Sequence, residues 1–532
     1  MSFVTKLMFI GVATVPVVAF AQVKPEWAVA SAIVAPKPAV SAPQLVVSQV
    51  VFTGNSVFSQ DVLQSVIAPD LGKQMTLDDI RGLADQVKSH YHASGYRLAN
   101  VVVPKQRFES GKPVELVITE GWLDRVEVSG NQRYASRRVM NALSAHSVSS
   151  GAAFKFNDLE RALTRLNRQS GITTAATLKA GDELGATTLA VSVTEAPRVR
   201  GAVEINNYGS KNTGEVRVIP SIEVPNATGR GDVFSMLALK SISGEGTFFG
   251  RMAYEIPLGH KGYRLSAFYS QGNSSVGGDF SALDVRGDNK SIGVGVLKEF
   301  IRSPQRVDVI DAWLESHDIK QEILGSTTSD DRVRKLRLGY TRENSAAKHR
   351  TVISTQLHQG LGAVLGGMEN NSVLSSRSVS GADNQFTKLT VELSRLQRLN
   401  ARTLIIPRAT VQVSSDPLVV GEQISIGGFY SVAGHAPSAH SGDSGILLNL
   451  EGRYAARPND DRVQYFARLD HGRVLVNKTF IGQRRQEDLT GAALGIIANP
   501  WRNVSFRLEY AKPIGDRTED GQYFYAQARY QF

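Results

Sequence analysis

Residues 200–532 alternate between apolar and polar side chains in one short segment after another, and this pattern constrains the fold more than any other feature. In the last segment, Phe524, Ala526 and Tyr530 share one side, whereas Gln527 and Arg529 share the other. A period of two is typical of β-strands with one polar and one apolar face. The segments are 200–208, 214–224, 232–242, 247–256, 263–270, 290–300, 307–317, 332–341, 350–359, 385–396, 402–414, 445–455, 463–474, 489–498, 503–512 and 522–532. They make sixteen, an even number, as a closed antiparallel membrane barrel requires.

The connections between these segments distinguish a membrane barrel from a water-soluble sheet, which would alternate as well. Connections after even-numbered segments are short, as at 225–231, while those after segments 5, 7, 9, 11 and 13 are long, among them 271–289 and 318–331. Short periplasmic turns and long external loops are typical of outer-membrane barrels. No apolar run near twenty residues follows the N-terminus, which excludes a helical membrane bundle.

The first 21 residues have the pattern of a secretory signal peptide. Lys6 is followed by the apolar stretch Leu7–Ala19, and Ala19-Phe20-Ala21 is a small-x-small cleavage site. Residues 22–43 are rich in Ala and Pro and are expected to form a linker, within which Trp27–Val34 can form a short helix that plugs the pore. The chain has no cysteine, which excludes disulfides, thiolate metal sites and thiol nucleophiles.

Between the linker and the barrel, a strand–helix–helix–strand–strand pattern occurs twice. The first copy opens with Val50–Asn55 and the second with Val126–Asn131, each a short strand that ends in Gly-Asn. In each copy the second helix has its own start signal, with Thr76 and Asn157 expected to cap it. We expect one α/β domain over residues 44–122 and a second over residues 123–197, followed by the barrel over residues 198–532.

The doubled module resembles the POTRA domains (polypeptide-transport-associated domains) that precede certain outer-membrane barrels. The loop between segments 11 and 12, at about 415–444, is similar to the inward-folded loop six of two-partner secretion transporters of the TpsB type, the haemolysin secretion/activation protein family. The matching residues of this loop are Gly427, Gly428, Val432, Ala433, Gly434 and His435. The resemblance implies a membrane all-β fold, a 16-stranded antiparallel outer-membrane β-barrel preceded by two periplasmic α/β POTRA domains.

A lumenal strand motif accompanies the loop in this family. Its residues here are Phe466, Arg468, Asp470 and Gly472, which alternation places on the lumenal face. The resemblance implies that a loop arginine pairs with the lumenal aspartate, but Ala433 stands at the arginine position. Arg468 and His435 are the candidate substitutes, because an unpaired buried carboxylate costs about 3–5 kcal/mol.

The resemblance further implies that a large exoprotein, similar to an adhesin or a haemolysin, is recognised in the periplasm and exported through the pore without nucleotide hydrolysis. A client could add a strand to an exposed module edge through backbone hydrogen bonds. The expected edge consists of Leu98, Ala99, Asn100, Val101, Val102 and Val103. The expected lumen wall is polar and of mixed charge, lined by Lys335, Arg337, Lys388, Glu392, Arg507, Glu509 and Arg529. The terminal Phe532 resembles the signal read by the barrel-insertion machinery.

Two alternatives remain open at this point: an outer-membrane protein insertase of the same superfamily, and a diffusion porin. Neither catalytic residues nor a cofactor or metal site is predicted, so we do not expect an enzyme. Lys and Arg exceed Asp and Glu by 60 − 50 = 10, but the basic residues are spread along the chain, so no nucleic-acid partner is expected. The expected partners are the exoprotein, periplasmic chaperones and insertion machinery during assembly, and outer-membrane lipid and lipopolysaccharide.

Overall fold

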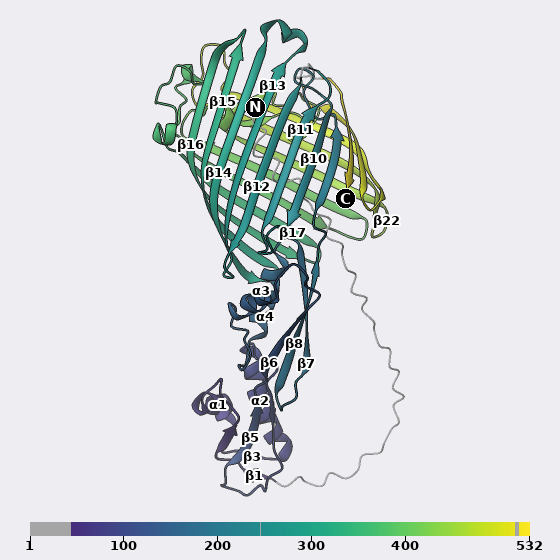
Figure 1. Ribbon diagram of the computed structural model, residues 1–532. Helices are drawn as coiled ribbons and strands as arrows, with labels where there is room; N and C mark the ends of the chain where they lie inside the picture. Colours follow the sequence, from purple (N-terminus) through teal and green to yellow (C-terminus); the bar gives the residue numbers. More distant parts are fainter. Residues whose placement is uncertain (1–43, 245, 516–520) are drawn as a thin grey trace.

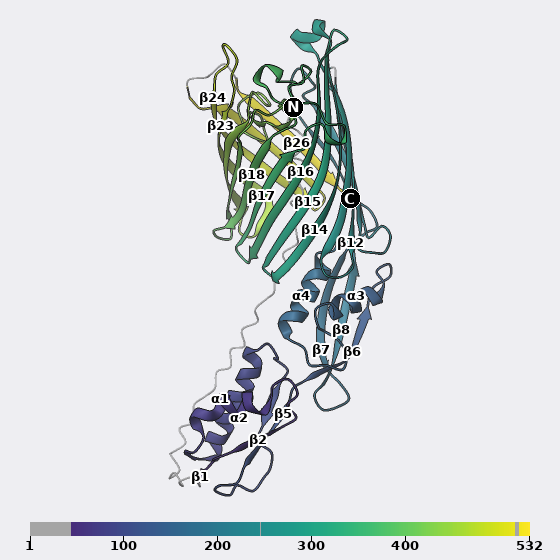
Figure 2. The same cartoon turned by 90° about the vertical axis from the view of Figure 1, so that its left-hand side faces the viewer.

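The structure is a computed structural model and describes residues 44–244, 246–515 and 521–532 (Figure 1). Two small α/β modules follow one another below a closed β-barrel, and the second module lies against the barrel (Figure 2). The expected signal peptide and linker, with Trp27–Val34, lie outside the described residues. Within those residues, no helix has both the length and the apolar character needed to cross a membrane.

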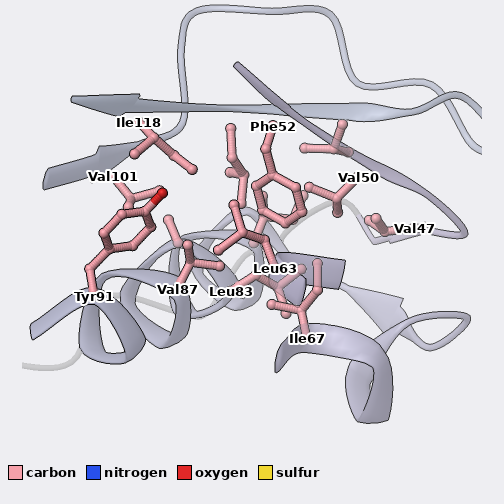
Figure 3. Close-up of a cluster of buried hydrophobic side chains, with 14 of the residues drawn as sticks. Val47, Val50, Phe52, Leu63, Ile67, Leu83, Val87, Tyr91, Val101 and Ile118 are labelled. Carbon is pink, nitrogen blue, oxygen red and sulfur yellow. The ribbon is translucent and has the colours of Figure 1, made fainter. Parts of the chain in front are cut away.

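The first module packs two helices on a three-stranded sheet with strand order β2-β5-β4. Its elements are β1 (Leu45–Val46), β2 (Val50–Thr53), α1 (Gln60–Ile67), η2 (Ala68–Asp70), β3 (Gln74–Met75), α2 (Leu77–Ala93), β4 (Asn100–Val102) and β5 (Val114–Thr119). Leu63, Leu83 and Val87 of the helices pack against Phe52 and Ile118 of the sheet (Figure 3). This apolar layer between helices and sheet is the core of the module.

The second module repeats this arrangement with strand order β6-β8-β7. Its elements are β6 (Trp122–Ser129), α3 (Ser136–Ser144), α4 (Phe156–Asn167), β7 (Ile172–Ala180) and β8 (Ala186–Glu195). The cap predicted at Asn157 is wrong, because α4 starts one residue earlier and the N-cap residue, Lys155, makes no side-chain cap. The Phe156 N–H donates instead to Gly95 O of the first module at 3.0 Å, so a contact between modules fixes this helix end.

A glutamate at the end of the last strand of each module accepts hydrogen bonds from the backbone N–H groups that follow the Gly-Asn turn of that module. Glu195 accepts from the backbone N of Gln132, Arg133 and Tyr134 at 2.8–2.9 Å and from Arg133 Nε at 2.8 Å. Burial acts to raise the pKa of Glu195, but these donors outweigh it and lower the pKa to about 2. Glu120 holds the equivalent loop of the first module, and the same balance lowers its pKa as well.

The barrel is closed and consists of sixteen strands, as predicted. The strands are β9 (Arg200–Asn206), β10 (Arg217–Pro225), β11 (Val233–Ser241), β12 (Thr247–Leu258), β13 (Tyr263–Val276), β14 (Val285–Ser303), β15 (Arg306–Ile323), β16 (Ser326–Ala346), β17 (His349–Gly360), β18 (Thr387–Arg398), β19 (Thr403–Ser414), β22 (Ser444–Arg457), β23 (Asp460–Leu475), β24 (Gln486–Trp501), β25 (Val504–Pro513) and β26 (Tyr523–Gln531). Each pairs antiparallel with its neighbour, and β26 closes the cylinder on β9.

Two of the expected long loops are wrong. Residues 277–284 connect β13 to β14, and only residues 324–325 connect β15 to β16, because these four strands continue beyond the predicted segments (Figure 1). The added residues include polar side chains on both faces, as in Asp318–Gln321, where only Ile319 is apolar, so they lack the alternation that marks a strand in lipid. They are strands because the ladder pairs them directly, as Lys290 with Asp318 and Asp318 with Arg332.

Buried charges join the second module to the periplasmic rim of the barrel. Arg165 of α4 donates from Nη1 to Glu299 Oε2 at 3.1 Å and from Nη2 to Glu299 O at 3.1 Å. Arg168 pairs with Glu299 and, through Nη1, with Glu343 Oε2 at 3.2 Å. The side chain of Glu299 is 4% exposed and also lies 3.3 Å from Nη2 of Arg264. The second module therefore has a defined contact with the periplasmic ends of β13–β16.

Candidate functional site

Loop six, residues 415–443, folds back into the barrel between β19 and β22. It contains the turn η6 (Val420–Glu422) and a small hairpin of β20 (Ile424–Ile426) with β21 (His440–Gly442). Its Val432 and Ala433 are fully buried. A Cβ at Gly491 of β24 would lie 1.8 Å from Ala433 O, so the loop rests directly on the backbone of the wall.

The predicted motif residues meet around Asp470, which is fully buried on β23. Arg468 Nε lies 2.8 Å from Asp470 Oδ2, and Ala433 N donates to the same oxygen at 3.1 Å. Asn449 Nδ2 donates to Asp470 Oδ1 at 2.7 Å. His435 Nε2 lies 2.9 Å from Thr490 O. Of the two candidate substitutes, Arg468 is therefore the cation beside Asp470.

The other predicted loop and strand residues shape this contact. Gly427 and Gly428 have positive φ angles of 107° and 89°, which glycine adopts freely, and they turn the chain into Phe429. Phe429 O accepts from Arg468 Nη2 at 2.9 Å. A Cβ at Gly472 would lie 2.7 Å from Ile426, so this glycine leaves room for the loop hairpin. The residue types of the two motifs thus match a close loop–wall contact.

An aromatic cluster, which the sequence did not indicate, joins loop six to the strands where the barrel closes. The rings of Phe429 and Tyr208 stack with centroids 3.6 Å apart, and Tyr525 of β26 lies edge-on to Phe429 at 5.3 Å. The predicted motif residue Phe466 lies under Arg507, with the guanidinium 3.9 Å from the ring centroid. Loop six thus contacts the first and last strands together.

Glu422 is a second anchor of loop six and was missed in the sequence. Lys335 Nζ lies 2.7 Å from its Oε1 and Lys388 Nζ lies 2.6 Å from its Oε2. All three side chains are at most 8% exposed, so these two predicted lumenal lysines are buried between the wall and loop six. The partner of the two lysines, Glu422, lies on loop six, far along the chain. The signal in the sequence that could have indicated this site is a single acidic residue among apolar ones shortly before Gly427-Gly428.

A third anchor ties loop six to another external loop. Asp443, fully buried, accepts from Leu418 N at 2.9 Å and from Asn477 N at 2.8 Å. Arg377, from residues 361–386, lies 2.5 Å from Asp443 Oδ1 and also donates to Leu418 O at 2.7 Å. The external loop thereby covers loop six from outside.

The lumen beside loop six contains a cavity of 230 Å³. Trp313, Arg337 and His358 of the wall line it together with Gly428 and Phe429 of the loop. Residues of loop six therefore form one side of this cavity within the lumen.

The predicted docking edge is shorter in the structure than in the sequence. Asn100, Val101 and Val102 form β4 at the edge of the first sheet, and Val103 follows it. Ala99 is 2% exposed, and Leu98 packs against the core of the second module. Leu98 therefore belongs to the contact between the modules and Ala99 to the core of the first module, so neither lies on an open edge.

Phe532 lies directly after β26, with an exposed side chain. Its backbone N and O pair with Gly201 O and N, both at 3.0 Å. A Cβ at Gly201 would lie 2.3 Å from the Phe532 ring, so the terminal ring packs over the first strand.

Comparisons with known proteins agree with this geometry. A model of the haemolysin secretion/activation protein family ShlB/FhaC/HecB matches residues 185–498, and a model of the ShlB-type POTRA domain matches residues 45–121. The heme/hemopexin transporter protein HuxB of Haemophilus influenzae (strain 86-028NP) is 23% identical over 481 residues, which cover 89% of this chain and 84% of that protein. The hemolysin transporter protein ShlB of Serratia marcescens is 24% identical over 388 residues, which cover 70% and 65%.

Solved structures show the same fold. CdiB from Escherichia coli superposes with a TM-score of 0.76 at 19% identity, covering 94% of this chain and 93% of that chain. BamA from Haemophilus ducreyi lacking POTRA domains 1–3 superposes with a TM-score of 0.52 at 14% identity, covering 92% and 100%. Because the first family model spans more than half of the chain, the chain belongs to the ShlB/FhaC/HecB family of haemolysin secretion/activation proteins, which are outer-membrane transporters.

Proposed function

We propose that this transporter exports one large protein, which its two modules receive in the periplasm and its barrel passes outward without catalysis or nucleotide hydrolysis. Similar proteins are named as transporters of hemolysin and of heme/hemopexin, and CdiB is a further similar transporter. The observation that carries the proposal is a lumen that contains one loop held only by hydrogen bonds and ion pairs. Such a loop can leave the pore and return, because no covalent bond holds it.

The three anchors define how loop six is held. Asp470 and Arg468 both lie on β23 and hold the loop through Ala433 N and Phe429 O. Two buried charge contacts involve the loop itself: Glu422 with Lys335 and Lys388, and Asp443 with Arg377. Each is favourable only while both partners stay together, since a buried charge without its partner costs about 3–5 kcal/mol. A passing chain that hydrates the lumen would lower this cost and release the loop.

The remaining steps follow from the surroundings of the pore. A client strand can add to the edge of β4, where Asn100 and Val102 are exposed. Folding of the client outside the cell would make return unfavourable and drive export. During assembly, chaperones and the insertion machinery would recognise the Phe532 end, and lipid and lipopolysaccharide would cover the apolar outer wall.

Deleting the transporter in its host tests the proposal. We expect one very large protein to disappear from the medium while the other outer-membrane barrels keep their abundance. Loss of those barrels with no missing secreted protein would contradict export and favour the insertase alternative.

Loop release can be measured in planar bilayers with the purified protein. Glu422→Gln removes the carboxylate that Lys335 and Lys388 share and leaves Lys335 with only the more distant Glu315, at 3.6 Å, so we expect more frequent and longer open-state currents than in the wild type. Glu109→Gln, in an exposed pair with Lys112 of the first module, is the matched control and should conduct like the wild type. Identical currents in all three proteins would contradict the anchor role of Glu422.

A further inference from the structure

The outer wall of the barrel carries a group of cations at its periplasmic end. Val296, Ile310 and Leu338 are exposed apolar residues in the lipid-facing rows of β14, β15 and β16. Because side chains alternate along a strand, every second residue beyond them, toward the periplasmic turns, belongs to the same rows. Four cations in these rows form the basic cluster: Lys298, Arg302, Arg306 and Arg342.

Exposed tyrosine rings lie next to these cations and indicate their depth in the membrane. Lys298 Nζ lies 3.8 Å from the centroid of the Tyr263 ring, and the guanidinium of Arg342 lies 5.7 Å from that of Tyr340. Aromatic side chains on the outer wall of a membrane barrel gather at the two boundaries between lipid and water. The basic cluster therefore lies at the height of the headgroups of the inner leaflet.

One carboxylate, that of Asp308, orients three of the four cations. Arg342 Nε donates to Asp308 Oδ1 at 3.0 Å, and Arg302 Nε donates to Asp308 Oδ2 at 3.2 Å. Arg306 Nη2 lies 3.8 Å from the same Oδ2. The side chain of Asp308 is 5% exposed, whereas those of the three arginines are 42–58% exposed. The carboxylate therefore lies beneath the arginines, which present their outer groups to the membrane.

The basic cluster has more positive charge than its protein partners balance. Four cations share one carboxylate, which leaves a charge of 4 − 1 = +3. Within the described residues, Lys298 pairs with no carboxylate, and its Nζ donates to Lys261 O at 2.5 Å. Arg302 donates only from Nε, so neither of its Nη groups has an acceptor in the part of the chain that the structure describes. Such a free pair of guanidinium N–H groups matches the oxygens of a phosphate.

The external end of the same three strands has a different charge balance. There, Arg334 Nη1 lies 2.6 Å from Asp318 Oδ1, and Lys320 Nζ lies 2.6 Å from Glu322 Oε1. Each of these cations has a carboxylate of its own on the outer face. The excess of positive charge is thus specific to the periplasmic end, where the anions that surround a barrel are the phosphates of phospholipids.

We propose that the basic cluster is a binding site for an anionic phospholipid of the inner leaflet. The phosphate accepts hydrogen bonds from Arg302 Nη groups and Lys298 Nζ, and the acyl chains lie along the apolar rows above them. A lipid fits better than a free phosphate ion, because the apolar rows begin directly beside the cations. The site lies back to back with the contact to the second module (Figure 2), since Glu299 directly follows Lys298 on β14. This inference needs only a barrel in lipid and does not depend on export.

Native mass spectrometry of the full-length protein in a neutral detergent, titrated with phosphatidylglycerol, tests this site. Lys298→Gln with Arg302→Gln should weaken binding of the tightest phosphatidylglycerol about 30-fold, because each cation near a lipid headgroup contributes about fivefold. Lys73→Gln with Arg81→Gln, in exposed pairs of the first module, changes the net charge equally and should bind like the wild type. Phosphatidylcholine, whose headgroup has no net charge, should bind the wild type more weakly.

A second variant and a second measurement keep the outcome clear. Lys298→Gln alone breaks no ion pair within the described residues, so the barrel should stay folded, and phosphatidylglycerol should bind it about fivefold more weakly. In nanodiscs of phosphatidylcholine, added phosphatidylglycerol should lower hydrogen exchange at the periplasmic ends of β14 and β16 in the wild type and not in the double variant. Equal binding of phosphatidylglycerol by the wild type and the double variant would overturn the proposal. Displacement of the lipid by inorganic phosphate at a similar concentration would overturn it as well, because the site would then be one for a free ion.

Discussion

The first module hangs at the far end of the molecule, whereas the second lies between it and the barrel (Figure 2). Both have the same helices, sheet order and turn-binding glutamate, Glu120 in one and Glu195 in the other. Within the described residues, only the second has arginines that reach the barrel: the buried Arg165 on its second helix and the partly exposed Arg168 directly after it. The comparison teaches that the same module fold can either stand apart from the barrel or bind to it. Which of the two it does depends on a few charged residues outside the core of the module.

The largest expected effect comes from breaking the contact that distinguishes the second module. Glu299→Gln leaves Arg165 and Arg168 without their shared carboxylate, at a cost of about 3–5 kcal/mol to the module–barrel contact. Hydrogen exchange in α4 of the full-length protein should rise strongly while exchange in α2 stays constant. Glu109→Gln, in an exposed pair, is the control. Unchanged exchange in α4 would mean that the contact between the second module and the barrel does not depend on this carboxylate.

Acid tests the shared framework of the modules. The pKa of Glu195 lies at about 2, below its ordinary value of 4.5, so its stabilisation is complete above pH 4.5 and is lost as the pH falls toward 2. The loss is about 3 kcal/mol of the free energy of unfolding of the second module. Urea unfolding of the modules in the full-length protein should show about 2 kcal/mol of this loss between pH 5 and pH 3, because part of the stabilisation is still present at pH 3. Glu195→Gln should unfold more easily at pH 5 and respond less to acid, and an unchanged acid response would contradict the role of Glu195.

The smallest expected effect sharpens the difference between the two second helices. Thr76 forms a capping box with Asp79, so Thr76→Ala should cost the first module about 1 kcal/mol. Asn157→Ala should cost almost nothing, because α4 has no side-chain cap. Urea unfolding of both variants measures the difference, and equal losses would contradict it.

The barrel was predictable because lipid on one side and the lumen on the other impose alternation on each strand. Alternation fails where β13–β16 leave the membrane, and there polar strands such as Asp318–Gln321 were expected to be loops. The physical signal is absent because water contacts both faces of those segments.

The site was predictable where family motifs mark it and hidden where distant charges meet. The loop motif and Asp470 were found by resemblance, and Arg468 followed from its place two residues away on the same face. The contact of Glu422 with Lys335 and Lys388 joins residues 87 and 34 positions apart. No local pattern carries such a pairing, since it depends on how loop six enters the closed cylinder.

The barrel strands differ in length, so the wall of the barrel is higher on one side of its external opening than on the other. β15 and β16 have 18 and 21 residues, whereas β9 and β10 have 7 and 9, and each residue adds roughly 3.3 Å along a strand. The external rim of the barrel is therefore uneven, and the wall is highest at β13–β16 (Figure 1). A polypeptide that leaves the barrel meets the sheet of β13–β16 on one side and water on the other. Its first ordered structure would therefore form against these four strands.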